Sequence, residues 1–158
     1  MAPQGAMLVT RVGGLACAFP IQHVIETMRP LPVESIGRSG DEGLAVVDGL
    51  AMIRGAPVPV VDARRLLGVP GECAARFVIV RAAERRVAVA VDAVIAVVRI
   101  ELAALAGLPP LLGGAHRDCI AAIGTRDAGL LAVLDAARLL PPGSWLAIER
   151  AREPSGEP

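Results

Sequence analysis

The stretch Val58-Pro-Val-Val-Asp-Ala-Arg-Arg-Leu-Leu67 aligns without gaps on Leu131-Ala-Val-Leu-Asp-Ala-Ala-Arg-Leu-Leu140. Six of the ten aligned pairs are identical, and both copies carry the run Asp-Ala-x-Arg-Leu-Leu directly after an apolar segment. A short apolar segment predicts a strand, and an aspartate after it can cap a short helix. Because self-similarity at a fixed spacing indicates a repeated structural unit, we expect two similar β-rich units in this chain.

A second match, about 72 residues apart, supports the repeat: Leu15-Ala-Cys-Ala-Phe19 corresponds to Val87-Ala-Val-Ala-Val91. The two units then cover about 7–68 and 76–141, with turn residues between them. A unit of about 70 residues buries too little surface to be stable alone, so both are predicted to pack into a single domain over 7–152.

Short apolar runs dominate the remaining sequence and predict a mainly β fold. They are Leu8–Val12, Leu15–Phe19, Val58–Val61, Phe77–Val80, Val87–Val91, Val94–Ile100 and Leu130–Leu134. In Val87–Val91 valine alternates with alanine, which predicts a valine face and an alanine face on a strongly curved small barrel.

Helices are predicted to be few and short. Asp62 is expected to cap a helix over 63–67 that ends at Gly68, and Asp135 is expected to cap a second over 136–140. A third is predicted over 144–152, followed by a disordered tail over 153–158. Asp92, which follows a strand, fits the start of a turn.

Composition and charge disfavour several classes of function. All 16 basic residues are arginine, and they balance 16 acidic residues to a net charge of zero, whereas nucleic-acid-binding proteins usually carry a basic excess. The absence of lysine excludes Schiff-base chemistry and a phosphate-binding P-loop. We therefore expect no nucleic-acid partner.

The cysteines and histidines do not form a metal-binding pattern. Three cysteines and two histidines are scattered along the chain, so no set of three or four ligands has zinc-site spacing, and we expect neither a metal nor a cofactor. His116 and Cys119 lie close enough in sequence to leave a small thiol enzyme as an alternative, although a cysteine there also fits the start of a buried strand.

The longest apolar run, Val87 to Val98, has 12 residues and contains Asp92, so it is too short to span a bilayer. The N-terminal residues lack the basic and apolar regions of a secretory signal. These features, with an odd number of widely spaced cysteines, predict a cytoplasmic protein that does not insert into a membrane.

Five short motifs lie in order between Leu8 and Leu140. They are Ala18-Phe-Pro-Ile-x-x-Val24-x-Glu26, Gly49-x-x-x-Ile-Arg-Gly55, Val58-Pro-Val-Val-Asp62, Val91-Asp-Ala-Val-x-x-Val97 and the run from Leu131 to Leu140. In type and order these motifs resemble the CheW family of chemotaxis coupling proteins.

That resemblance implies two five-stranded SH3-like barrels packed around a hydrophobic core, with a C-terminal helix against them. It also implies a protein without catalytic residues, which bridges the cytoplasmic tip of a chemoreceptor to the regulatory domain of a CheA-type histidine kinase. Matched to the family motifs, Val24, Glu26, Gly49 and Arg54 are expected on the partner-binding surface. Met52 stands where the family commonly has a polar residue.

The sequence leaves two further functions open. A coupling protein of the same fold can serve a different output, such as pilus motility or gene regulation. A purely structural barrel can instead use its exposed strand edges to self-associate.

Overall fold

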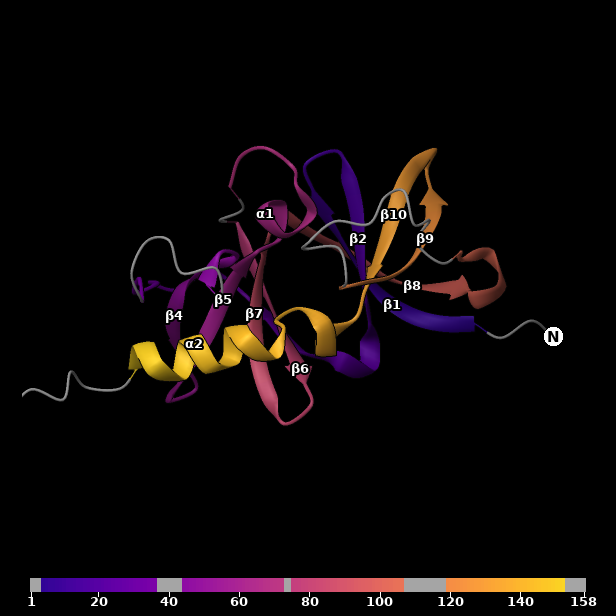
Figure 1. Cartoon of the computed structure of the whole chain (residues 1–158). Helices are drawn as coiled ribbons and strands as arrows, with labels where there is room; N and C mark the ends of the chain where they lie inside the picture. The colour runs from indigo at the N-terminus through magenta and orange to yellow at the C-terminus, as the bar shows by residue number, and fades with distance from the viewer. Residues whose placement is uncertain (1–3, 37–43, 73–74, 107–118, 153–158) are drawn as a thin grey trace, which may run out of the picture.

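The computed structural model describes residues 4–36, 44–72, 75–106 and 119–152, and within them ten strands form two five-stranded sheets (Figure 1). Sheet A has the strand order β8-β1-β2-β10-β9, and sheet B has the order β3-β6-β7-β5-β4. Sheet A consists of β1 (Gln4–Val12), β2 (Leu15–Pro20), β8 (Ala93–Glu101), β9 (Ile120–Arg126) and β10 (Gly129–Leu134). Sheet B consists of β3 (Val24–Met28), β4 (Val47–Ile53), β5 (Ala56–Asp62), β6 (Arg76–Ala82) and β7 (Arg85–Val91). The predicted mainly β fold with two five-stranded units is confirmed.

The repeat is visible in the topology, although each repeated unit contributes strands to both sheets. Adding five to each strand number of sheet B, and counting from one again after ten, gives the strand order of sheet A. Strands β1 and β2 of the first unit join β8, β9 and β10 of the second, and the converse holds in sheet B. We expected residues 7–68 to form one barrel and 76–141 the other. Instead, each sheet contains strands from both units.

Both sheets curl until their edge strands are linked. In sheet B the segment after β3 bridges to β4, through Glu34 N to Leu50 O and Leu50 N to Glu34 O, each 2.8 Å. In sheet A the segment after β8 bridges to β9 through the same pair of bonds between Ala106 and Ile123, also 2.8 Å each. The two bridges lie at corresponding positions of the repeat, and this curling is typical of small barrels.

Strand β7 lies in the middle of sheet B, between β6 and β5. All of Val87–Val91 is buried, so the valine and alanine faces are both covered. The alternation was predicted to separate two faces of a curved strand, and the structure adds that neither of them meets solvent. Pairing with two neighbours and packing on both sides require this continuous apolar run.

The helical segments follow the predicted caps, with changes in length. Helix α1 (Ala63–Leu67) begins after Asp62, whose Oδ1 accepts a bond from Arg64 N at 2.8 Å, and it ends at Gly68 with φ 72°. Asp135 accepts from Ala137 N at 3.0 Å, but only a 3-10 turn, η5 (Ala136–Arg138), follows, so the predicted helix over 136–140 is too long.

The C-terminal helix α2 (Pro142–Arg152) begins two residues before the predicted start at 144. Proline is well tolerated in the first turn of a helix, where its missing N–H removes no intrahelical bond. Ala147 and Ile148 are buried, and the helix lies across sheet B (Figure 1). The predicted tail over 153–158 lies outside the described residues.

The core has two parts. The larger apolar cluster draws on both sheets and both α-helices, with Val12 and Phe19 from sheet A, Val78 from sheet B, Leu66 from α1 and Ile148 from α2. The smaller cluster lies within sheet A and consists of Met7, Val9, Ala18, Leu131 and Val133. Because the larger cluster includes side chains of both sheets, the sheets are packed as a single body.

An ionic junction also joins the sheets. Asp92 lies where the chain passes from β7 of sheet B to β8 of sheet A, and its Oδ2 accepts a bond from Gly13 N in the β1–β2 turn at 2.7 Å. Arg64 of α1 donates to both Asp92 oxygens, at 3.2 and 2.7 Å, and to the carbonyl of Pro70. The sequence predicts only a turn at Asp92, and nothing in it pairs this residue with Arg64.

Candidate partner-binding surface

The expected site residues Glu26 and Arg54 meet at the curled edge of sheet B. Glu26 is on β3 and Arg54 follows β4, and these are the two edge strands of that sheet. Arg54 Nε donates to Glu26 Oε2 at 3.1 Å and Arg54 Nη2 donates to Glu26 Oε1 at 2.8 Å. A two-bond pair of this kind fixes the orientation of the guanidinium as well as its position.

The backbone of Arg54 is constrained as strongly as its side chain. Arg54 has φ 54° and Gly55 has φ 78°, so both central residues of the β4–β5 turn are left-handed. Such turns suit a β-hairpin and prefer asparagine and glycine, whereas an arginine there is disfavoured. The Arg54 side chain is nevertheless 69% exposed. An exposed cation is therefore held in place at some cost in backbone strain.

The ion pair changes the protonation behaviour of both partners. Hydrogen bonds from Arg54 lower the pKa of Glu26 below its ordinary value, outweighing partial burial, which raises it. The positive charges of Arg54 and, further away, Arg86 act in the same lowering direction. The same hydrogen bonds raise the pKa of Arg54. Glu26 therefore stays ionised to a lower pH than an ordinary glutamate does, because its pKa is lowered.

Gly49 is buried in β4, beneath the segment that follows β3. A Cβ atom at this position would overlap the backbone carbonyl of Glu34, which forms the bridge to Leu50. Glycine is therefore required for this close approach. Because Gly49 itself has little exposed surface, it can affect a partner only indirectly, by allowing the shape that this edge of the sheet adopts.

Val24 and Met52 flank the ion pair on the two edge strands. Val24 is half-buried on β3, where it packs against the larger core cluster. Met52, on β4, is 63% exposed. An exposed apolar side chain beside a fixed charge is typical of protein–protein contact surfaces, in which methionine and arginine are enriched. The resemblance marked Met52 only as a departure from the family, and the structure adds that its side chain is exposed on an edge strand.

The two cysteines that the structure describes do not resemble a nucleophilic site. Cys119 is 2% exposed and belongs to the larger core cluster, and Cys17 is buried as well. A reactive thiol needs access to its substrate. His116, the other half of the thiol alternative, lies outside the described residues. In the described ranges, no three histidine, cysteine or acidic side chains are grouped as metal ligands.

Comparison with known proteins identifies the family. Residues 6–142 match the model of the CheW-like domain, so the chain belongs to the CheW-like family. Among solved structures, it resembles the scaffolding protein TtCheW from Thermoanaerobacter tengcongensis, with a TM-score of 0.70 and 19% sequence identity. That match covers 85% of this chain and 90% of the other. No curated protein gave a significant match.

The family is one of scaffold and coupling proteins rather than enzymes. In the described part of the chain, no helix has the length and apolar character that crossing a membrane requires.

Proposed function

We propose that this chain is a non-enzymatic adaptor that couples chemoreceptors to a CheA-type histidine kinase. Its partners are the regulatory domain of the kinase and the cytoplasmic tip of the receptor. The adaptor works in the cytoplasm and is recruited to receptor arrays at the membrane. Membership of the CheW-like family supports this role.

The conformation of Arg54 is the observation that carries the proposal. An exposed ion pair stabilises a fold little, yet the chain places an arginine in a left-handed turn to form one with Glu26. Two of the five guanidinium N–H groups are used by Glu26, which leaves others to bind a carboxylate or carbonyl of a partner. Arginine held in this way is a typical interface anchor.

Such an adaptor acts through binding alone. A receptor and a kinase that bind the adaptor together are coupled when the binding of one changes the affinity of the adaptor for the other. The coupling free energy is the same in both directions. In this proposal Val24, Glu26 and Arg54, with Gly49 beneath them, form one of the two binding surfaces.

The test is a titration of the purified chain against the regulatory domain of a CheA-type kinase from the same cell. In the variant Arg54→Asn, asparagine suits the left-handed turn, so the hairpin is retained while the charge is lost. We expect about tenfold weaker binding, as for the loss of one anchor side chain. Glu26→Gln should weaken binding in the same direction, because it releases the guanidinium.

Asp127→Asn is the matched control, since Asp127 has φ 50° in the corresponding β9–β10 turn of sheet A. It should bind the kinase domain as tightly as the unchanged protein. Equal affinity of Arg54→Asn and Asp127→Asn would contradict the proposed surface. Absence of binding by a folded, unchanged protein would contradict the coupling role itself.

A further inference from the structure

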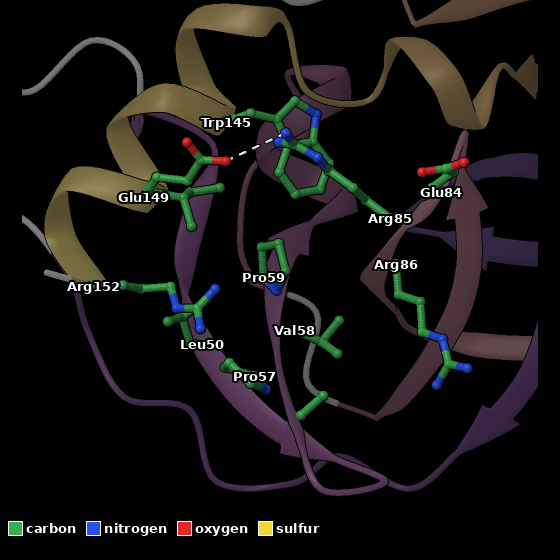
Figure 2. A pocket seen from close by; sticks show the side chains of 12 residues that line it. Leu50, Pro57, Val58, Pro59, Glu84, Arg85, Arg86, Trp145, Glu149 and Arg152 are labelled. Atoms are coloured by element: carbon green, nitrogen blue, oxygen red, sulfur yellow. Dashed lines mark ion pairs between the residues drawn. The ribbon is translucent and has the colours of Figure 1, made fainter.

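A groove of about 310 Å³ lies on sheet B, where β5 and β7 separate beneath α2, and it extends from Ala56, directly after the β4–β5 turn, to Trp145 of α2 (Figure 2). The two strands run parallel, but their pairing is limited to Val60–Asp62 with Ala88–Ala90. The preceding residues of both strands diverge and form two walls of the groove. Helix α2 provides the third wall, through Trp145, Ile148, Glu149 and Arg152.

The β5 residues that line the groove are suited to a place where β7 does not pair with them. Pro57 and Pro59 line the groove, and neither has a backbone N–H to donate. The separation of β5 from β7 therefore leaves no unpaired backbone N–H group at Pro57 or Pro59. Pro57, Pro59 and Leu50 also give the groove an apolar floor, visible below the indole in Figure 2.

The upper end of the groove is fixed by an aromatic and ionic contact. The guanidinium of Arg85 lies over the ring of Trp145, 4.6 Å from its centre. Arg85 Nη2 also pairs with Glu149 Oε1 at 3.3 Å, as the dashed line in Figure 2 shows. These contacts restrain Trp145 where it lines the groove, so a ligand that enters meets a positioned aromatic side chain.

Two further arginines flank the groove from opposite walls. Arg152 extends from α2 above Leu50 and Pro57, and Arg86 extends from the β7 side (Figure 2). Among the described residues, neither Arg86 nor Arg152 has an ion-pair partner within 4.0 Å, although the charge of Arg86 also acts on Glu26 at longer range. Glu84, in the β6–β7 turn, is the one lining carboxylate besides Glu149. The unpaired charge of the groove is thus positive on balance.

We propose that this groove binds an extended acidic peptide of a protein partner, one that carries carboxylates around a proline or aliphatic residue. Grooves lined by aromatic side chains favour proline-rich extended segments, whose conformation is already formed before binding. Arginines on both sides supply charge-assisted hydrogen bonds to carboxylates. The proposal goes beyond the adaptor role, since the Glu26–Arg54 surface does not depend on Trp145 or Arg152.

The intrinsic fluorescence of the protein provides a direct assay. Trp145 is the only tryptophan and the chain has no tyrosine, so the emission comes from one wall of the groove. The probe is a synthetic peptide, acetyl-Glu-Pro-Leu-Glu-Pro-amide, compared with the peptide in which both glutamates are lysine. We expect a saturable change in emission with the acidic peptide and none with the basic one.

Substitutions on the groove separate this site from the surface around Arg54. Arg152→Glu should weaken acidic-peptide binding about tenfold, since it removes one charged hydrogen-bonding partner and adds repulsion. Glu84→Gln should strengthen binding about twofold by removing a like charge. Arg76→Glu is the matched control, at the far end of the β6–β7 pair from Arg85, and should leave peptide affinity unchanged. Arg152→Glu should also leave kinase-domain binding unchanged.

Three results would overturn the proposal. One is equal binding of the acidic and basic peptides, and another is equal affinity of Arg152→Glu and Arg76→Glu. The third is a change of Trp145 emission with protein concentration alone, because a second copy of the chain would then be the occupant. None of these results depends on whether the kinase domain binds at Arg54.

Discussion

Arg54 keeps its charge at a defined place because its side chain and its backbone are both restrained. The two hydrogen bonds to Glu26 orient the guanidinium, and the left-handed turn fixes the direction in which the side chain leaves the sheet. A flexible surface arginine would lose more conformational entropy on meeting a partner. Restraint before binding therefore favours recognition at this residue.

The ion pair should make stability depend on pH in a defined direction. Because the pKa of Glu26 is lowered in the folded state, its contribution is present above the ordinary value of 4.5 and is lost as pH falls through the lowered pKa. We expect the free energy of unfolding of the unchanged protein to exceed that of Glu26→Gln at neutral pH. This difference should shrink to zero in acid, as measured by urea unfolding over a pH series.

The same comparison in an Arg54→Ala background is the control. Without the guanidinium, the largest cause of the lowered pKa of Glu26 is absent and only the opposing effects of partial burial and Arg86 are left, so the pH-dependent effect of Glu26→Gln should be much smaller there. If Glu26→Gln changed the free energy of unfolding with the same pH dependence in the Arg54→Ala background, that pH dependence would come from a group other than the ion pair.

The turns of the β-hairpins place several residues other than glycine in the left-handed backbone conformation. Left-handed residues occur in all four tight β-hairpins that the described residues contain, and only some of them are glycine. Gly13 and Gly55 suit their turns, whereas Ala83 has φ 58° and Ala128 has φ 63°. An alanine in this region is strained by its Cβ atom. The β6–β7 and β9–β10 turns can therefore be improved without altering the strands.

Replacing Ala83 by glycine should stabilise the protein. The substitution relieves the left-handed strain, and we expect a gain of about 0.5–1 kcal/mol in the free energy of unfolding. Thermal or urea unfolding measures it. The neighbouring Ala82→Gly is the control, since Ala82 is buried at the end of β6, and it should instead destabilise the protein. Destabilisation by Ala83→Gly would show that the alanine conformation carries no strain.

Elements were predictable where their cause is local. The caps at Asp62 and Asp135 follow from a side chain and an amide two residues further on, so the sequence contains all that forms them. The length of the segment after Asp135 was not predictable, because it depends on how Leu139 and Leu140 are buried in the core. The burial of both faces of β7 likewise depends on strands distant in the chain.

The relation between the sheets could not be predicted from the repeat. Sequence similarity identifies which strands correspond, but it does not say that strand β2, besides pairing with β1 of its own unit, also pairs with β10 of the other. The Glu26–Arg54 pair was hidden for the same reason: its members were expected on one surface by resemblance, and their contact requires the curled sheet. The groove beside Trp145 arises where β5 and β7 diverge, and this divergence has no pattern in the sequence beyond two prolines.

The junction at Asp92 should contribute to the stability of the whole molecule. Arg64→Ala removes two bonds to Asp92 and one to Pro70, and it leaves a half-buried carboxylate without its cation. We expect a loss of about 2 kcal/mol in the free energy of unfolding. Both sheets should remain in one cooperative transition, because the larger apolar cluster still joins them.

Arg138→Ala is the matched control for this prediction. Arg138 corresponds to Arg65 in the repeat, and its pair with Asp135 is 3.5 Å long with the arginine two-thirds exposed. Its loss should cost less than about 0.5 kcal/mol in urea unfolding. Equal effects of the two substitutions would mean that the junction adds nothing beyond an ordinary surface pair.

Strand exchange also sets the order in which the molecule can assemble on the ribosome. Sheet B uses strands that lie one after another from Val24 to Val91, so all of it can form as soon as that stretch has been synthesised. Strands β1 and β2 are made first, yet their partners β8 and β10 begin only at Ala93 and Gly129. The β1–β2 hairpin therefore has neither of its neighbouring strands until the later part of sheet A has been synthesised.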